Sequence, residues 1–227
     1  MTRFLKLTNA ANRAIFALSL PLLASPLLAN GIAVDSGIYS WSETDTPNNA
    51  ADLPGGLRTS FGPFHVVGHD RAELAGSIET DTPAQFHAML KAFPSIKQID
   101  MVDCPGTGDD EANFTLARMI RRAGIATYVP GGGFVASGGV ELFLAGVHRR
   151  ADPDAEFAVH SWRDSDGLEA ADFANDDPVN VTYINYYREM GMGEAQARAF
   201  YALTNSVNHD DALYLKAADI ARYVRLD

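Results

Sequence analysis

The sequence predicts a layered α/β fold with a largely parallel sheet at its core. Short apolar runs typical of strands alternate with segments whose apolar residues recur at helical spacing. This alternation favours strands joined by helical crossovers over a sheet built from hairpins. About 200 residues follow a leader-like start, which is enough for one domain with a sizeable hydrophobic core.

The start of the chain differs in character from the rest. Arg3, Lys6 and Arg13 form a basic segment, and an uncharged apolar run follows it up to Ala29. This combination predicts a secretory signal peptide over residues 1–29, with Ala29 as the favoured cleavage residue. An uncleaved membrane anchor is the alternative. Because either form places the domain outside the cytoplasm, we expect a periplasmic or secreted protein.

Charge and composition exclude several functions. The formal charge is -11, and loss of the three basic leader residues would lower it to -14, which disfavours nucleic-acid binding. Cys104 is the only cysteine, so no disulfide forms within the chain, and its neighbours would not activate its thiol. Glycines 131–133 lack the lysine of a phosphate-binding loop. His65 and His69 have no third ligand nearby. We therefore expect neither a cofactor nor a metal.

The expected strands begin after an N-terminal arm. Residues 30–60 are polar and rich in turn-forming residues, and we interpret them as an irregular arm ahead of a domain over 61–227. Apolar and β-branched residues are concentrated in five later runs, each bounded by polar or turn-forming residues. These runs comprise residues 64–69, 74–79, 96–102, 125–130 and 156–162.

The expected helices lie between and after these strands. Pro83 suits the first turn of a helix that begins at Thr82. The carboxylates at 109–111 suit the positive end of the next helix. A third helix follows Ser137 and is too apolar to lie on a surface. Two further helices and a tail with a short helix and a strand complete the chain, over residues 178–191, 193–205 and 208–227.

The most informative segment is GGGFVASGGVELFLAG, residues 131–146. It places Ser137 between glycines at the start of the apolar helix. Such a serine lies at the positive end of the helix dipole, next to backbone N–H groups that lack intrahelical partners. Those groups could bind the oxygen that becomes negative when a hydroxyl attacks a carbonyl. The alternative interpretation is a glycine-rich loop capped by an ordinary serine.

Two more residue types complete a hydrolytic arrangement. A serine nucleophile needs a base, and histidine suits that role at neutral pH. His160 ends an apolar strand, where side chains reach the carboxyl edge of a parallel sheet. An aspartate, Asp210 or Asp211, would orient the imidazole. The alternative for His160 is a structural role on its strand.

These segments resemble a known family. LAGSIETDTPAQF, VDCPG, VASGGVELFLAG, RRADPDAEFAVHSW and DDALYLKAADIARY occur in an order and spacing similar to the Clp protease proteolytic subunits, within the ClpP/crotonase fold. The likeness spans residues 74–227 and is closest to secreted ClpP-like proteins of bacteria. It implies repeated β-β-α units with C-terminal helices and a homo-oligomer. It also implies Ser137 as nucleophile, His160 as general base, and the Gly138 N–H as an oxyanion donor.

The chain departs from the family pattern at two places. The family's turn commonly reads SPGG, whereas this chain has CPGT. The second oxyanion donor would be the N–H of Thr107 or Gly106, and a Cβ at Thr107 could restrict the backbone there. The family aspartate falls within one residue of Asp211, with Asp210 and Asn205 as rivals.

We therefore expect a secreted serine hydrolase, a peptidase, that uses Ser137, His160 and Asp211 on peptide or protein substrates. No ATPase partner is expected, because a protein outside the cytoplasm has no ATP to use. A catalytically inactive ClpP-like binding or assembly module is the alternative, motivated by the altered turn and the undecided aspartate. A third hypothesis is that the protein performs acyl chemistry on a thioester, as crotonase relatives do, and only the shared fold supports it.

Overall fold

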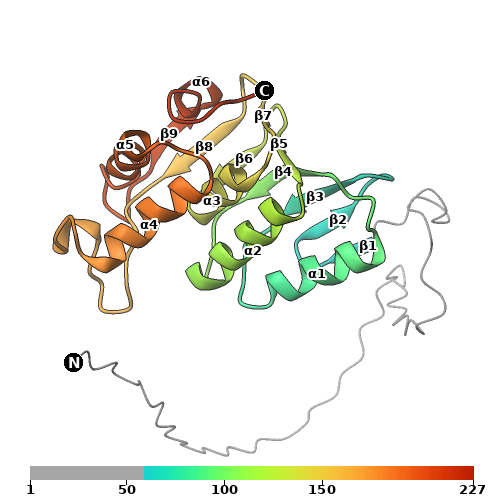
Figure 1. The fold of residues 1–227 in the computed structure, drawn as a ribbon, viewed down its shortest axis with the longest axis horizontal. Helices are drawn as coiled ribbons and strands as arrows, with labels where there is room; N and C mark the ends of the chain where they lie inside the picture. Colours follow the sequence, from blue (N-terminus) through green and yellow to red (C-terminus); the bar gives the residue numbers. More distant parts are fainter. Residues whose placement is uncertain (1–58) are drawn as a thin grey trace, which may run out of the picture. The chain divides into compact units, whose positions relative to one another are not determined.

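The computed structural model describes residues 59–227, which form a mixed α/β domain (Figure 1). The predicted signal peptide, 1–29, and nearly all of the predicted arm, 30–60, lie outside the described residues. The nine strands of the described part belong to one sheet, with parallel pairs at its centre and antiparallel pairs at two of its ends. The layered α/β class is thereby confirmed.

The sheet branches at its central strand, β4. The first half of β4 pairs with β5, which leads to β7, and the second half pairs with β6, which leads to β8 and β9. The strands are β1 (Thr59–Phe61), β2 (Phe64–Val66), β3 (Arg71–Ala75), β4 (Gln98–Cys104), β5 (Ala126–Val129), β6 (Phe134–Ala136), β7 (Arg149–Ala151), β8 (Glu156–Val159) and β9 (Leu213–Lys216). Two β-β-α units, β5–β6–α3 and β7–β8–α4, follow one another, as expected.

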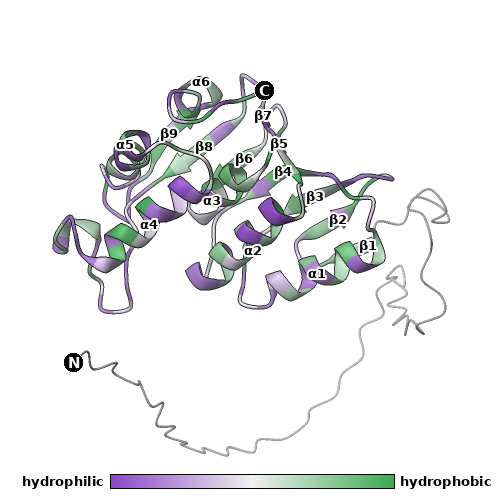
Figure 2. Ribbon diagram, in the orientation of Figure 1, coloured by the Kyte–Doolittle hydropathy of each residue, from purple (hydrophilic) through white to green (hydrophobic). Residues whose placement is uncertain are grey.

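Six α-helices accompany the sheet in the described part: α1 (Thr82–Ala92), α2 (Asp110–Arg122), α3 (Gly138–Ala145), α4 (Pro178–Glu189), α5 (Glu194–Thr204) and α6 (Ala217–Ile220). Pro83 lies in the first turn of α1, and the Asp109 side chain caps α2 by accepting from the Ala112 N–H. In Figure 2, hydrophilic and hydrophobic residues alternate along α2, and the buried ones include Leu116 and Ile120. Within residues 59–227, no helix combines the length and apolar character needed to cross a membrane.

The expected and observed strands differ in three ways. Strands β1, β6 and β7 were not anticipated, because each has only three residues and shows no usable alternation. Strand β3 lies earlier than the expected 74–79, since the chain leaves the strand at Gly76, which has a φ of 134°. Strand β8 ends at Val159, so His160 lies just beyond it.

Helix α3 is the centre of the core, and all eight of its residues are buried. Two glycines allow it to approach its neighbours closely. A Cβ on Gly138 would lie 2.5 Å from Thr107 Cγ2, and a Cβ on Gly139 would lie 2.8 Å from the Cys104 sulfur. The first turn of α3 therefore packs directly against the end of β4 and the loop that follows it.

We predict that Gly139→Ala destabilises the domain by about 1–3 kcal/mol, because the added methyl group overpacks a buried contact with backbone and side chain. Urea unfolding followed by circular dichroism measures this change. Gly68→Ala is the matched control, since a Cβ there meets no atom within 4 Å. Equal stability of the two variants would contradict the close packing of α3.

Candidate active site

The parallel strands bring Ser137 and His160 to the same edge of the sheet. Ala136 of β6 pairs with Ala158 of β8, and the Ser137 N–H donates to the Ala158 carbonyl at 2.9 Å. Each candidate residue follows the carboxyl end of its strand, the region where ligands bind in parallel α/β sheets. Thr107 follows the neighbouring β4 in the same way. The structure thus assembles the predicted serine, histidine and oxyanion loop.

The Ser137 backbone has an unusual conformation. Its φ of 49° and ψ of -129° make it the one non-glycine residue with positive φ within residues 59–227. A conformation of this kind costs on the order of 1–3 kcal/mol and persists only where the surrounding structure enforces it. The side chain does not cap α3, although Ser137 occupies the cap position. Its hydroxyl is therefore not used to stabilise the helix.

Two backbone N–H groups next to Ser137 are available as donors. Gly138 is the first residue of α3, where the N–H has no intrahelical acceptor. The parallel β-bridge between Ile78 and Thr107 consists of two hydrogen bonds, from the Ile78 N–H to the Gly106 carbonyl and from the Gly108 N–H to the Ile78 carbonyl. The Thr107 N–H takes part in neither of them. Of the two predicted alternatives, Gly106 contributes its carbonyl to this bridge, and the Thr107 N–H is the donor that we carry forward.

The Thr107 side chain stabilises this loop. Its one hydroxyl proton is shared between the Ile78 and Asp109 carbonyls, at 3.0 and 2.9 Å, and its oxygen accepts from the Asp109 N–H at 3.0 Å. The methyl-bearing side of the residue packs against Gly138. Because φ at Thr107 is not positive, its Cβ causes no backbone strain. The loop therefore accommodates a threonine where the family pattern has glycine, and the hydrogen bonds of the threonine hydroxyl fix its position.

A carbonyl group sets the tautomer of His160. Its Nδ1 lies 2.8 Å from the Ser161 carbonyl oxygen, which can only accept, so Nδ1 carries the proton. In neutral imidazole this leaves Nε2 free to accept a proton. No hydrogen bond joins Ser137 to His160 in the described structure, although both line the same two cavities. Catalytic hydrogen bonds are often long before substrate binds.

The expected Ser–His–Asp triad is not assembled in this structure. Asp211 is exposed, and its hydrogen bond runs from its backbone N–H to the Asn208 carbonyl. Asp210 forms an ion pair with Arg163 at 2.9 Å. The third candidate, Asn205, lines the cavity beside Ser137, where its amide donates to Tyr201. The Ser161 carbonyl, in place of the expected carboxylate, is the hydrogen-bond acceptor of His160 Nδ1.

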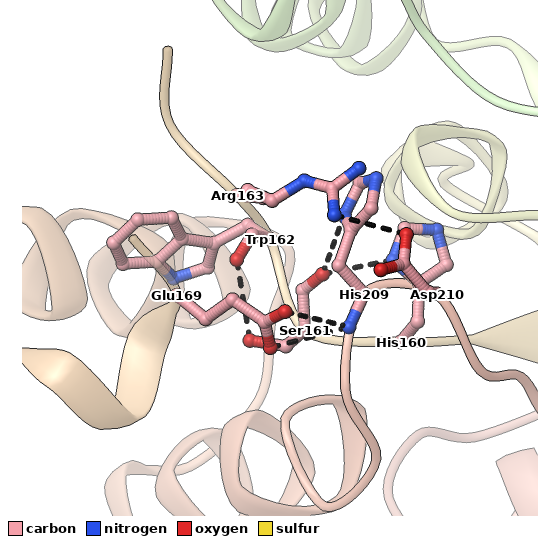
Figure 3. A network of polar contacts seen from close by, with 7 residues as sticks. All are labelled: His160, Ser161, Trp162, Arg163, Glu169, His209 and Asp210. Carbon is pink, nitrogen blue, oxygen red and sulfur yellow. Dashed lines mark hydrogen bonds and ion pairs between the residues drawn. The ribbon is translucent and has the colours of Figure 1, made fainter. Parts of the chain in front are cut away.

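His209, which the sequence analysis did not single out, lies against the His160 ring. The ring centroids are 4.6 Å apart in an edge-to-face arrangement, and His209 Nδ1 also donates to the Ser161 carbonyl, at 3.0 Å. Figure 3 shows both rings converging on this oxygen. The Glu169 carboxylate accepts a hydrogen bond from the backbone N–H of His209. The only sequence signal was the proximity of His209 to the candidate aspartates.

Two cavities meet at Ser137 and His160. The outer cavity, of about 170 Å³, is lined also by Thr107, Arg163 and His209. The inner cavity, of about 40 Å³, extends between α2, α3, α4 and α5. Apart from Ser137, Gly138, Val159 and His160, its walls are Asp110, Asn113, Phe114, Glu141, Trp162, Tyr183, Tyr187, Tyr201, Thr204 and Asn205. Ser137 and His160 therefore border both cavities.

Glu141 is a buried carboxyl group in the wall of the inner cavity. It lies on α3, is 8% exposed, and accepts a hydrogen bond from the Tyr187 hydroxyl at 2.8 Å. Burial raises the pKa of Glu141 from 4.5 to about 7, and nearby Asp110 adds to the rise while the Tyr187 hydrogen bond opposes it. No lysine or arginine of residues 59–227 forms an ion pair with it.

Other candidate groups have structural surroundings. Burial raises the pKa of the Cys104 thiol to about 12, so a reactive thiolate does not form at neutral pH. His65 Nδ1 is 2.7 Å from the Ser60 hydroxyl. Across the described residues, no cluster of three or more histidine, cysteine or acidic side chains has a geometry suited to a metal ion.

Comparisons with known proteins give limited likeness. No family model and no curated protein matches this chain. Among solved structures it is similar to a serine-to-alanine mutant of the 1510-N membrane-bound stomatin-specific protease (16% identity, 66% of this chain, 73% of that chain, TM-score 0.47). A second mutant of the same protease, in complex with a substrate peptide, has 18% identity over 66% of this chain and 69% of that chain, with a TM-score of 0.44. A ClpP1 mutant from Listeria monocytogenes has 20% identity over 68% of this chain and 87% of that chain, with a TM-score of 0.48. At these values the likeness assigns no activity.

We predict that Glu141→Gln removes a pH-dependent loss of stability. A glutamate with a folded-state pKa of about 7 and an ordinary value of 4.5 binds its proton more tightly in the folded state. Protonated Glu141 therefore contributes fully to the free energy of unfolding below pH 4.5. This contribution is lost as the pH rises to 7, by roughly 3 kcal/mol at most. The variant should gain stability over the wild type at pH 8 and gain little at pH 4.5.

Urea unfolding at both pH values measures this difference. Glu111→Gln is the control, because Glu111 is exposed on α2. An equal effect of Glu141→Gln at the two pH values would contradict the assignment of Glu141 as a buried carboxyl group that resists ionisation.

Proposed function

We propose that this protein is a serine hydrolase that cleaves peptide bonds, with Ser137 as nucleophile and His160 as general base. The observation that carries the proposal is the strained Ser137 backbone at the start of a buried helix, next to a histidine whose free nitrogen is an acceptor. Strain of this kind is concentrated at active sites. A merely structural serine would gain nothing from this conformation.

In the proposed reaction, Ser137 Oγ attacks the carbonyl carbon of the substrate while His160 Nε2 takes the hydroxyl proton. The carbonyl oxygen becomes negative and is bound by the N–H groups of Gly138 and Thr107. The C–N bond then breaks, and the imidazolium returns the proton to the leaving amine. Water, deprotonated by His160, hydrolyses the resulting ester and releases the acid and the free serine.

The Ser161 carbonyl performs the orienting role that we had expected of Asp211. It accepts from Nδ1 of His160, which fixes the ring and the tautomer. A carbonyl dipole stabilises the imidazolium less than a full negative charge does. We therefore propose a Ser–His pair in which Asp211 is not required. The peptidase acts outside the cytoplasm, after removal of residues 1–29, and without an ATPase partner.

Labelling with a fluorophosphonate, followed by peptide mass spectrometry, tests this proposal. Ser137 should be the modified residue, and His160→Ala should lower the labelling rate by about 100-fold or more, because the base is lost. Asp211→Asn should leave the rate within about threefold.

Ser137→Ala provides the blank. A folded protein that remains unlabelled would overturn the hydrolase proposal and favour the alternative of an inactive binding module. Loss of labelling in Asp211→Asn would instead restore the carboxylate to the triad.

A further inference from the structure

The inner cavity has an unusual excess of hydrogen-bond acceptors. Two buried side-chain oxygens have no partner within residues 59–227, Asn113 Oδ1 and Asn205 Oδ1. Both residues line the inner cavity beside Ser137. Unpaired buried polar atoms are rare in folded proteins, and they are expected to bind water or a ligand.

The orientation of both amides is determined by their hydrogen bonds. The Asn113 amide nitrogen donates to the Gly138 carbonyl at 2.9 Å, and the Asn205 amide nitrogen donates to the Tyr201 carbonyl at 2.8 Å. Carbonyl oxygens only accept, so neither amide can be turned round without losing its bond. The unpaired atoms are therefore acceptors. Asn113 is only 1% exposed, so its oxygen has no access to bulk water.

Glu141 adds a third acceptor and a potential negative charge to the same cavity. One of its oxygens is engaged by Tyr187, and burial without a cation nearby makes its ionised form costly. A positively charged group in the cavity would remove that cost. Asp110 also lines the cavity, and its negative charge points to the same kind of ligand. No lysine or arginine of the described chain lies in the cavity wall.

The size of the cavity limits the group that fits. The cavity is small, at about 40 Å³, which favours an unbranched side chain over a ring or a branched guanidinium group. The remaining walls include the rings of Phe114, Trp162 and Tyr183. The Trp162 and Tyr183 rings are parallel within 2°, with centroids 6.1 Å apart. Aromatic walls suit an unbranched methylene chain that ends in a cation.

From these observations, and resting on the proposed function, we infer that the inner cavity binds a lysine side chain adjacent to the scissile carbonyl of the substrate. The lysine ammonium group has three donors, and the cavity offers three acceptors, Asn113 Oδ1, Asn205 Oδ1 and the Glu141 carboxylate. Because Ser137 also lines this cavity, a side chain bound there places its own carbonyl at the nucleophile. The protein is thus a peptidase that cleaves after lysine.

A pair of peptidyl diphenyl phosphonates tests this inference. One carries a lysine-like side chain next to phosphorus, and the other carries norleucine, which has the same carbon chain without the ammonium group. In each reaction Ser137 Oγ forms a bond to phosphorus and phenol leaves. We expect the lysine probe to label Ser137 about tenfold faster or more, the effect of one or two charge-assisted hydrogen bonds.

Glu141→Gln should reduce the lysine-to-norleucine ratio of labelling rates by about tenfold, because the carboxylate that faces the ammonium group is lost. Glutamine keeps the acceptor for Tyr187, and circular dichroism verifies that the variant is folded. Glu111→Gln is the matched control, because it removes one charge from α2 outside the inner cavity and should leave the ratio unaltered.

Two outcomes overturn the inference and are distinguishable. If the plain fluorophosphonate labels Ser137 and the norleucine probe reacts as fast as the lysine probe, the acceptors bind only water and the proposed hydrolase stands. If the plain fluorophosphonate does not label the folded protein, the hydrolase itself is rejected, and the lysine specificity falls with it.

Discussion

The conformation of Ser137 depends on the packing of helix α3, and so does the rest of the site. The helix is buried along its whole length, and Gly138 and Gly139 let its first turn approach Thr107 and Cys104. From the other side, β8 binds the Ser137 N–H. These constraints together enforce a positive φ that costs on the order of 1–3 kcal/mol, a cost that the burial of α3 offsets. The hydroxyl is thereby directed away from its own helix and toward the cavities.

The same packing explains why polar groups occur so deep in the structure. Asn113 holds the first carbonyl of α3, and Tyr187 donates to Glu141 in the middle of that helix. Each of these contacts joins α3 to a neighbouring helix and leaves an oxygen at the inner cavity. Stability and recognition therefore use the same side chains. Burial of Glu141 without a cation lowers stability near neutral pH, and this is a cost that a bound ammonium group would relieve.

Much of this arrangement could be predicted from the sequence. Alternating strand and helix patterns gave the layered α/β fold, and the apolar run after Ser137 gave the buried helix that positions it. Strand β6 was missed because three residues show no periodicity, yet this strand delivers Ser137 to the sheet edge. The hydrogen-bond partner of His160 could not be predicted, because it is a backbone carbonyl, and every residue of the sequence has one. Glu141 did leave a signal, as the one charged residue within an otherwise apolar helix.

The central claim is that Ser137 reacts with its developing oxyanion held by the N–H groups of Gly138 and Thr107. A crystal structure of the phosphonylated protein tests it most directly. We expect the phosphoryl oxygen within about 3 Å of both nitrogens, with His160 Nε2 facing the outer cavity. A phosphoryl oxygen that points to solvent, with neither N–H within hydrogen-bonding distance, would contradict the account.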